Sequence, residues 1–118
     1  MDQKMRREIC RLIAGLVVAD DDLTPPEEAF LDRVLEKFQI PQSERDSIFP
    51  IIDQAEAAET IRKLPQEAQN AALALLLEAT AADGVVAPEE RVYLGAVAQG
   101  LGMSEVELDR RIAQQMAQ

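Results

Sequence analysis

The residues best placed to do chemistry are carboxylates that recur in two short motifs. An aspartate followed by six residues and a glutamate occurs as Asp20 with Glu27 and again as Asp83 with Glu90. Further acidic side chains surround these pairs and are candidate secondary ligands: Asp21, Asp22, Glu28 and Glu89. Because all of these donors are oxygens, the set would select a hard divalent cation, Ca²⁺, Mg²⁺ or Mn²⁺, over zinc or copper.

The spacing does not fit an EF-hand loop. With Asp20 at the first position, Leu31 falls at the twelfth, where that loop needs a bidentate glutamate. A second explanation of the carboxylates also stands, because each motif leads into a predicted helix start. The free N–H groups and the positive dipole end of a helix stabilise negative charge there, so the same residues could serve only as loop and capping groups.

The composition excludes several kinds of chemistry. The chain has no histidine, which excludes Ser-His and Cys-His catalysis and HExxH zinc sites. It has no phosphate-cradling glycine loop, so we expect a protein that is not an enzyme. Its one cysteine, Cys10, cannot form an internal disulfide and is predicted to be a small buried hydrophobic residue. The net charge of −10 argues against nucleic acid as a partner.

The sequence predicts a cytoplasmic protein. No apolar run approaches the roughly 18 residues that a membrane span needs, and no signal peptide is recognisable. Basic residues lie beside the first apolar stripe: Lys4, Arg6, Arg7 and Arg11. A basic amphipathic helix of this kind could touch an anionic membrane surface peripherally, but an ordinary packed helix with a solvated basic side is the favoured interpretation.

Apolar residues at helical spacing predict seven helices and no strand. They are expected over 9–19, 25–40, 43–49, 53–63, 66–82, 88–101 and from 104 onward. Thr24 and Ser104 are predicted N-caps, each with a glutamate three residues later that completes a capping box. The helix over 66–82 is apolar around most of its circumference and is expected at the centre. The apolar side of the helix that starts at Pro88 carries Val92, Tyr93, Val97 and Leu101, with Gly100 and Gly102 marking its end.

The chain also repeats itself at a separation of 63 residues. That shift places Ala19-Asp20 on Ala82-Asp83 and Pro25 on Pro88, and it aligns further identical pairs: Glu27 with Glu90, Leu31 with Leu94, Val34 with Val97, Glu44 with Glu107 and Asp46 with Asp109. The predicted fold is therefore all-α: a single-domain helical bundle of about seven helices over residues 1–118. It is built from two similar halves, about 9–49 and 72–112. A pseudo-twofold arrangement of the halves would bring both Asp/Glu pairs into one oxygen-rich cage.

Two stretches of the chain resemble the signature of the TerB-like family, the tellurite-resistance protein B domain. They are 81–90, AADGVVAPEE, and 19–28, ADDDLTPPEE, and the resemblance spans roughly Ile9 to Ile112. It implies an all-helical bundle of two similar halves and a role in resistance to tellurite and other chemical stress. By position it also implies a metal site of Asp20, Glu27, Asp83 and Glu90. The chain departs from the pattern with Asp21 where the second motif has Gly84, which alters the turn because glycine accepts a positive φ more readily.

Two functions follow as expectations. The first is a non-enzymatic TerB-like stress-response module that binds a divalent cation, Ca²⁺, Mg²⁺ or Mn²⁺, between its two acidic loops. The second is an acidic helical adaptor for protein interaction, with no metal requirement, that docks a basic protein partner. A homodimer is compatible with either, since the basic N-terminal residues could pair with the acidic region of a second copy.

Overall fold

The computed structural model describes residues 2–17, 19, 25–41, 43, 54–82, 84 and 86–117. Within these ranges the chain forms six α-helices and no strand: α1 (Gln3–Val17), α2 (Pro25–Lys37), α3 (Gln54–Lys63), α4 (Gln66–Ala81), α5 (Pro88–Leu101) and α6 (Glu105–Met116). The prediction of an all-α fold is confirmed. The predicted helix over 43–49 lies outside the described residues except for Ser43.

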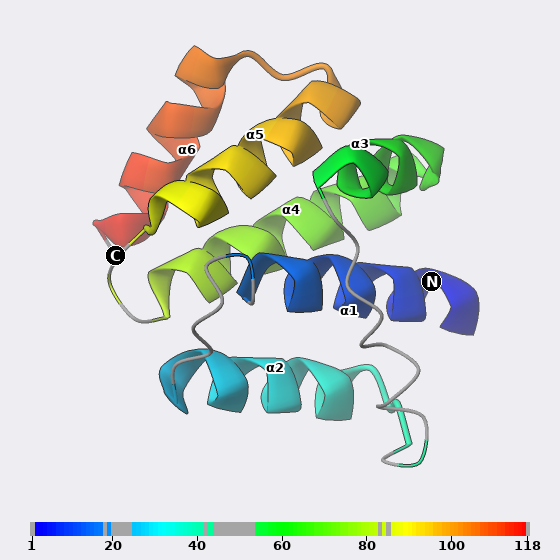
Figure 1. Cartoon of the computed structure of the whole chain (residues 1–118). Coiled ribbons are helices and arrows are strands. Elements are labelled where there is room, and N and C mark those ends of the chain that lie inside the picture. The colour runs from blue at the N-terminus through cyan, green and yellow to red at the C-terminus, as the bar shows by residue number, and fades with distance from the viewer. Residues whose placement is uncertain are drawn as a thin grey trace.

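The helix α4 lies at the centre of the molecule. It contacts each of the other five helices and crosses α1, while α2 packs on α1 and α4 from one side (Figure 1). On the other side α5 lies between α3 and α6 (Figure 1). The central position expected for the most apolar helix is confirmed, because side chains around much of α4 are buried, among them Leu73, Leu75, Leu76 and Leu77.

The apolar stripe of α1 faces α4 and the core. Ile9, Leu12, Ile13, Leu16 and Val17 are all 0% exposed. The basic residues of α1 remain partly or fully exposed on its other side. The face that α1 turns outward is therefore its charged face. No helix in the described ranges is both long enough and apolar enough to cross a membrane.

The helix boundaries follow the prolines and glycines of the sequence. Pro25 and Pro88 are the first residues of α2 and α5, where a fixed φ and a missing N–H cost nothing. Gly102 ends α5 with a φ of 74°, the left-handed conformation that glycine adopts without strain. The 63-residue shift also relates the helix starts, since it places Gln3 of α1 on Gln66 of α4 and Pro25 of α2 on Pro88 of α5.

The helices α3 and α5 approach each other closely at Gly100. A Cβ atom added there would lie 2.4 Å from the carbonyl oxygen of Ala58 and 2.6 Å from the Cγ2 atom of Ile61. Gly100 is therefore inside α5, and its role is to admit the backbone of α3 rather than to end the helix. The side chain of Gln69 contacts the C-terminal end of α3, because its Nε2 donates a hydrogen bond to the carbonyl oxygen of Ile61 at 3.0 Å.

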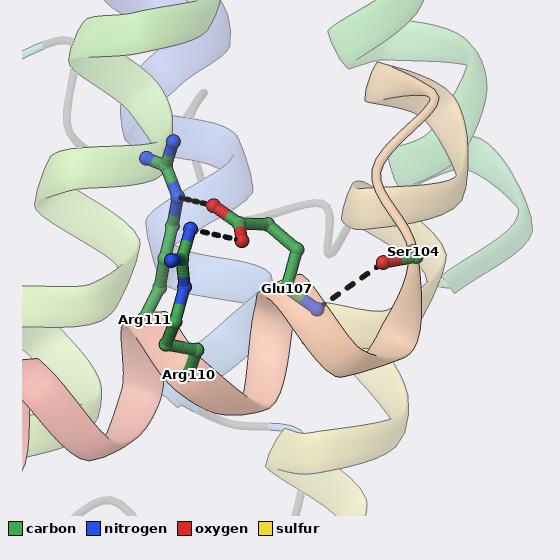
Figure 2. Close-up of polar contacts among 4 residues, drawn as sticks. All are labelled: Ser104, Glu107, Arg110 and Arg111. Atoms are coloured by element: carbon green, nitrogen blue, oxygen red, sulfur yellow. Dashed lines mark hydrogen bonds and ion pairs between the residues drawn. The ribbon is translucent and has the colours of Figure 1, made fainter.

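The last helix, α6, has several polar contacts among the side chains near its start. The Oγ of Ser104 accepts a hydrogen bond from the N–H of Glu107 at 3.2 Å, which confirms Ser104 as an N-cap (Figure 2). The predicted capping box also requires the Glu107 carboxylate to accept a hydrogen bond from the N–H of Ser104, and this part of the prediction is wrong. The Glu107 carboxylate instead binds the guanidinium groups of Arg110 and Arg111, one turn along the helix (Figure 2). The hydrogen bond from Arg111 is the main cause that lowers the pKa of Glu107.

Two apolar side chains stand out because they are exposed. Val92 of α5 is 53% exposed, so its predicted place on the buried side of that helix is wrong. The buried side of α5 is formed by Tyr93, Leu94, Val97 and Ala98 with Glu90. Val106 of α6 is 81% exposed. Both valines lie on the outer surface of the α5–α6 pair, away from the core.

Candidate functional site

The two predicted glutamate ligands, Glu27 and Glu90, are buried. Glu27 is 1% exposed and Glu90 is 2% exposed, and each is the third residue of its helix. In the part of the chain that the structure describes, no other charged residue is buried. The Oε2 atoms of both have almost no accessible surface. Two carboxylates are thus held inside the protein at matching positions of α2 and α5.

The adjacent glutamates differ from this pair. Glu28 and Glu89 are exposed, so the structure places these two candidate secondary ligands on the solvent side of their helices. The predicted aspartates Asp20, Asp21, Asp22 and Asp83 lie outside the described residues, as does the predicted N-cap Thr24. Within the described ranges no three acidic, histidine or cysteine side chains gather as a metal-binding group. Of the four proposed ligands, these ranges contain only the two glutamates.

The local geometry of Glu90 explains part of its burial. Its Oε1 accepts a hydrogen bond from the backbone N–H of Ala87 at 3.1 Å, which satisfies a donor at the start of α5. Ala87 has no side-chain acceptor and cannot return the bond. One carboxylate oxygen of Glu90 therefore acts as a helix cap, as the plainer interpretation of the motif expects.

The start of α5 is also attached to α1. The hydroxyl of Tyr93 donates a hydrogen bond to the carbonyl oxygen of Leu12 at 3.0 Å, and this contact is buried. At the corresponding position of α2 stands Phe30, which has no hydroxyl and whose ring lies 5.7 Å from the guanidinium carbon of Arg33. From the sequence, Tyr93 is expected only as one of the apolar residues of the helix that starts at Pro88. The signal that could have revealed its role is a lone tyrosine in a buried stripe, because a buried phenol needs a partner.

The helix ends that carry the motifs lie on one side of the molecule. In Figure 1 the C-terminal ends of α1 and α4 and the N-terminal ends of α2 and α5 are all toward the left of the view. A groove of about 330 Å³ opens there between the first turns of α2 and the last turn of α4. Its lining includes Pro26 and Phe30, on either side of Glu27 in sequence, and Ala82, which precedes Asp83.

The chemistry of the buried donors fits a hard divalent cation. Both buried side chains offer only carboxylate oxygens, which are the ligands of Ca²⁺, Mg²⁺ and Mn²⁺. Burial of a charged carboxylate is costly unless a cation or hydrogen bonds compensate it. Glu90 has such a hydrogen bond from Ala87, and both carboxylates offer oxygen donors that a cation held together with Asp20 and Asp83 would use.

Cys10 takes no part in such a site. It is fully buried in α1, and this burial raises the pKa of its thiol to about 12. A thiol that stays protonated is neither a good nucleophile nor a metal ligand. The prediction that Cys10 is a small buried hydrophobic residue is confirmed.

Comparisons with protein-family models, with curated proteins and with solved structures find no match to this chain. The resemblance of its two acidic motifs to the TerB-like family therefore stays a prediction.

Proposed function

We propose that this protein is a non-enzymatic, TerB-like module of stress and tellurite resistance that holds a divalent cation between two acidic loops. The proposed ligands are Asp20 and Glu27 from one loop and Asp83 and Glu90 from the other. The observation that carries the proposal is the burial of Glu27 and Glu90, the only buried charged residues in the described part of the chain.

The positions of the two glutamates support a shared site. The same 63-residue shift relates Glu27 to Glu90, the start of α1 to that of α4 and the start of α2 to that of α5. We therefore treat the α1–α2 pair and the α4–α5 pair as two similar halves related by a pseudo-twofold axis. In this arrangement each half contributes one aspartate and one glutamate, and the cation joins the halves.

A bound cation would act on the protein as a structural link. Because it binds only the folded state, saturating it at a hundred times its dissociation constant stabilises that state by about 2.7 kcal/mol. For a domain of this size that corresponds to a rise in melting temperature of roughly 10 °C. The fraction of folded protein would then depend on the cation concentration. This dependence suits a protein that acts in the response to metal stress.

The hydrogen bond between Ala87 and Glu90 favours a second candidate function. If both glutamates serve only as helix caps, the protein is an acidic adaptor with no metal requirement. Its net charge of −10 suits a basic protein partner, whose binding would weaken as salt is added.

Thermal melting during cation titration separates the two functions. The proposal expects millimolar Ca²⁺, Mg²⁺ or Mn²⁺ to raise the melting temperature and a chelator to reverse the rise. The D20N and D83N variants should each lose it. Glu59→Gln, which alters an exposed carboxylate of α3, is the matched control and should keep it. A melting temperature that none of these cations changes would contradict the cation site and favour the adaptor.

A further inference from the structure

The hydrogen bond between Tyr93 and Leu12 joins parts of the chain that lie far apart in sequence. Tyr93 is 3% exposed, and its hydroxyl reaches the carbonyl oxygen of Leu12 across 81 residues at 3.0 Å. A carbonyl oxygen has two lone pairs, so it can accept this bond in addition to one within its own helix. The contact therefore attaches α5 to α1 without breaking either helix.

The contact lies next to the proposed ligands along both helices. Tyr93 follows Glu90 by three residues, so the two side chains share one face of α5, and both are buried. On the other side of the contact, α1 continues from Leu12 to Val17, and Asp20 follows shortly after. The bond thus sets the first turn of α5, which carries Glu90, against the helix that leads to Asp20.

We infer that Tyr93 is a positioning residue for the proposed cation site and holds Glu90 in place relative to the opposite half. This inference rests on the proposed function. Groups that orient metal ligands without touching the metal commonly contribute tenfold or more to affinity, because they fix the ligands before the metal arrives. The Ala87 N–H fixes Oε1 of Glu90 locally, and Tyr93 fixes the whole helix start against α1.

The two halves differ in whether a hydroxyl group attaches the start of the second helix to its neighbour. Phe30 occupies the position of Tyr93 in α2 and has no hydroxyl with which to bind the helix it faces. The helix start that carries Glu27 is therefore positioned without such a bond, whereas the one that carries Glu90 has it. Removing the Tyr93 hydroxyl should therefore loosen the placement of Glu90 relative to α1, with no corresponding bond to lose at Phe30.

The test compares Tyr93→Phe with Ile61→Val. Both substitutions remove a small group from a fully or nearly fully buried side chain and leave the core otherwise filled. Ile61 lies on α3 beside Gly100, near the C-terminal end of α5 rather than its start. Calorimetric titration of each folded variant with Mn²⁺ measures the affinity, and thermal melting without cation measures the stability.

We expect Y93F to bind Mn²⁺ on the order of tenfold more weakly than the unaltered protein. We expect I61V to bind it with unchanged affinity although both variants melt at lower temperature. Equal Mn²⁺ affinity in Y93F and the unaltered protein would overturn the positioning role and leave the cation site intact. An unaltered protein that binds no Mn²⁺, Mg²⁺ or Ca²⁺ would overturn the proposed function and this inference together.

Discussion

The helix pairs α1–α2 and α4–α5 begin alike but have different surroundings. Each pair has a proline at the start of its second helix and a buried glutamate two residues later. Yet α5 is covered by α3 and α6, whereas in the described part of the chain α2 contacts α1 and α4. The burial of Glu27 and Glu90 is thus common to both pairs although their outer neighbours differ. The neighbours that α2 and α5 share are α1 and α4, since each of these two contacts both second helices.

The two central helices differ in the size of their core residues. Where α1 places Ile9 and Leu16, the 63-residue shift puts Ala72 and Ala79 of α4, and all four are 0% exposed. Large side chains on one helix and alanines on the other allow close packing at a crossing. The bulk of the shared core comes from α1 at these positions and from the leucines of α4 elsewhere.

The largest effect should come from truncating the centre of each pair. Ile13 of α1 and Leu76 of α4 are related by the 63-residue shift, and both are 0% exposed. Ile13→Ala and Leu76→Ala should each lower the free energy of unfolding by about 2–5 kcal/mol, because each leaves a cavity. Urea denaturation measures this loss. A cost below about 1 kcal/mol at either position would show that the two helices are not equivalent in the core.

A smaller effect should separate the outer ends of α2 and α5. Gly100→Ala should lower the free energy of unfolding by about 1–3 kcal/mol, since its Cβ would collide with the backbone of α3. The corresponding residue of α2, Lys37, is exposed, so Lys37→Ala should change stability by less than about 0.5 kcal/mol. Chemical denaturation of both variants checks the contrast. If both variants lost a similar free energy of unfolding, the close approach of α3 to Gly100 would not distinguish α5 from α2.

A further predicted effect depends on pH and concerns Cys10, whose counterpart in α4 is the buried Leu73. Burial raises the pKa of the folded thiol to about 12, while an unfolded thiol ionises near a pKa of about 8.5. Because the folded protein keeps the thiol protonated, the thiol's contribution to the free energy of unfolding is fully present below the unfolded pKa. It is lost as the pH rises toward the pKa of the folded state. The loss approaches about 1.4 kcal/mol for each pH unit in that window.

Urea denaturation as a function of pH measures the Cys10 contribution. Cys10→Ala removes the titrating group, so the variant should show a shallower fall in stability above about pH 9 than the unaltered protein. A thiol reagent at neutral pH should also modify Cys10 only as fast as the protein opens. Parallel pH profiles, or rapid labelling of the folded protein, would contradict the burial of this thiol.

Much of the fold could be predicted from local patterns. The apolar stripe of α1, the prolines that open α2 and α5 and the N-cap Ser104 each act over a few residues, and all lie where the spacing places them. Val92 and Gly100 could not be assigned correctly. Their environments depend on which neighbouring helix covers or approaches α5, and the periodicity of a single helix carries no information on that.

The candidate site could be predicted in part. Burial of Glu27 and Glu90 agrees with a ligand role, but their motif alone also suits surface caps like the exposed Glu28 and Glu89. The hydrogen bond from Tyr93 to Leu12 joins residues whose proximity depends on the packing of α5 on α1. The arrangement of the aspartates stays a prediction, because they lie outside the described residues.

The central claim, one cation shared by the two halves, is tested most directly by the variants Glu27→Gln, Glu90→Gln and their combination. For each, the rise in melting temperature on saturation with Mn²⁺ is compared with that of the unaltered protein. If one ion bridges the halves, either single variant removes most of the rise and the double variant removes little more. Two partial losses that add up in the double variant would instead indicate two separate ions, and a rise that survives in all three variants would contradict the cation site.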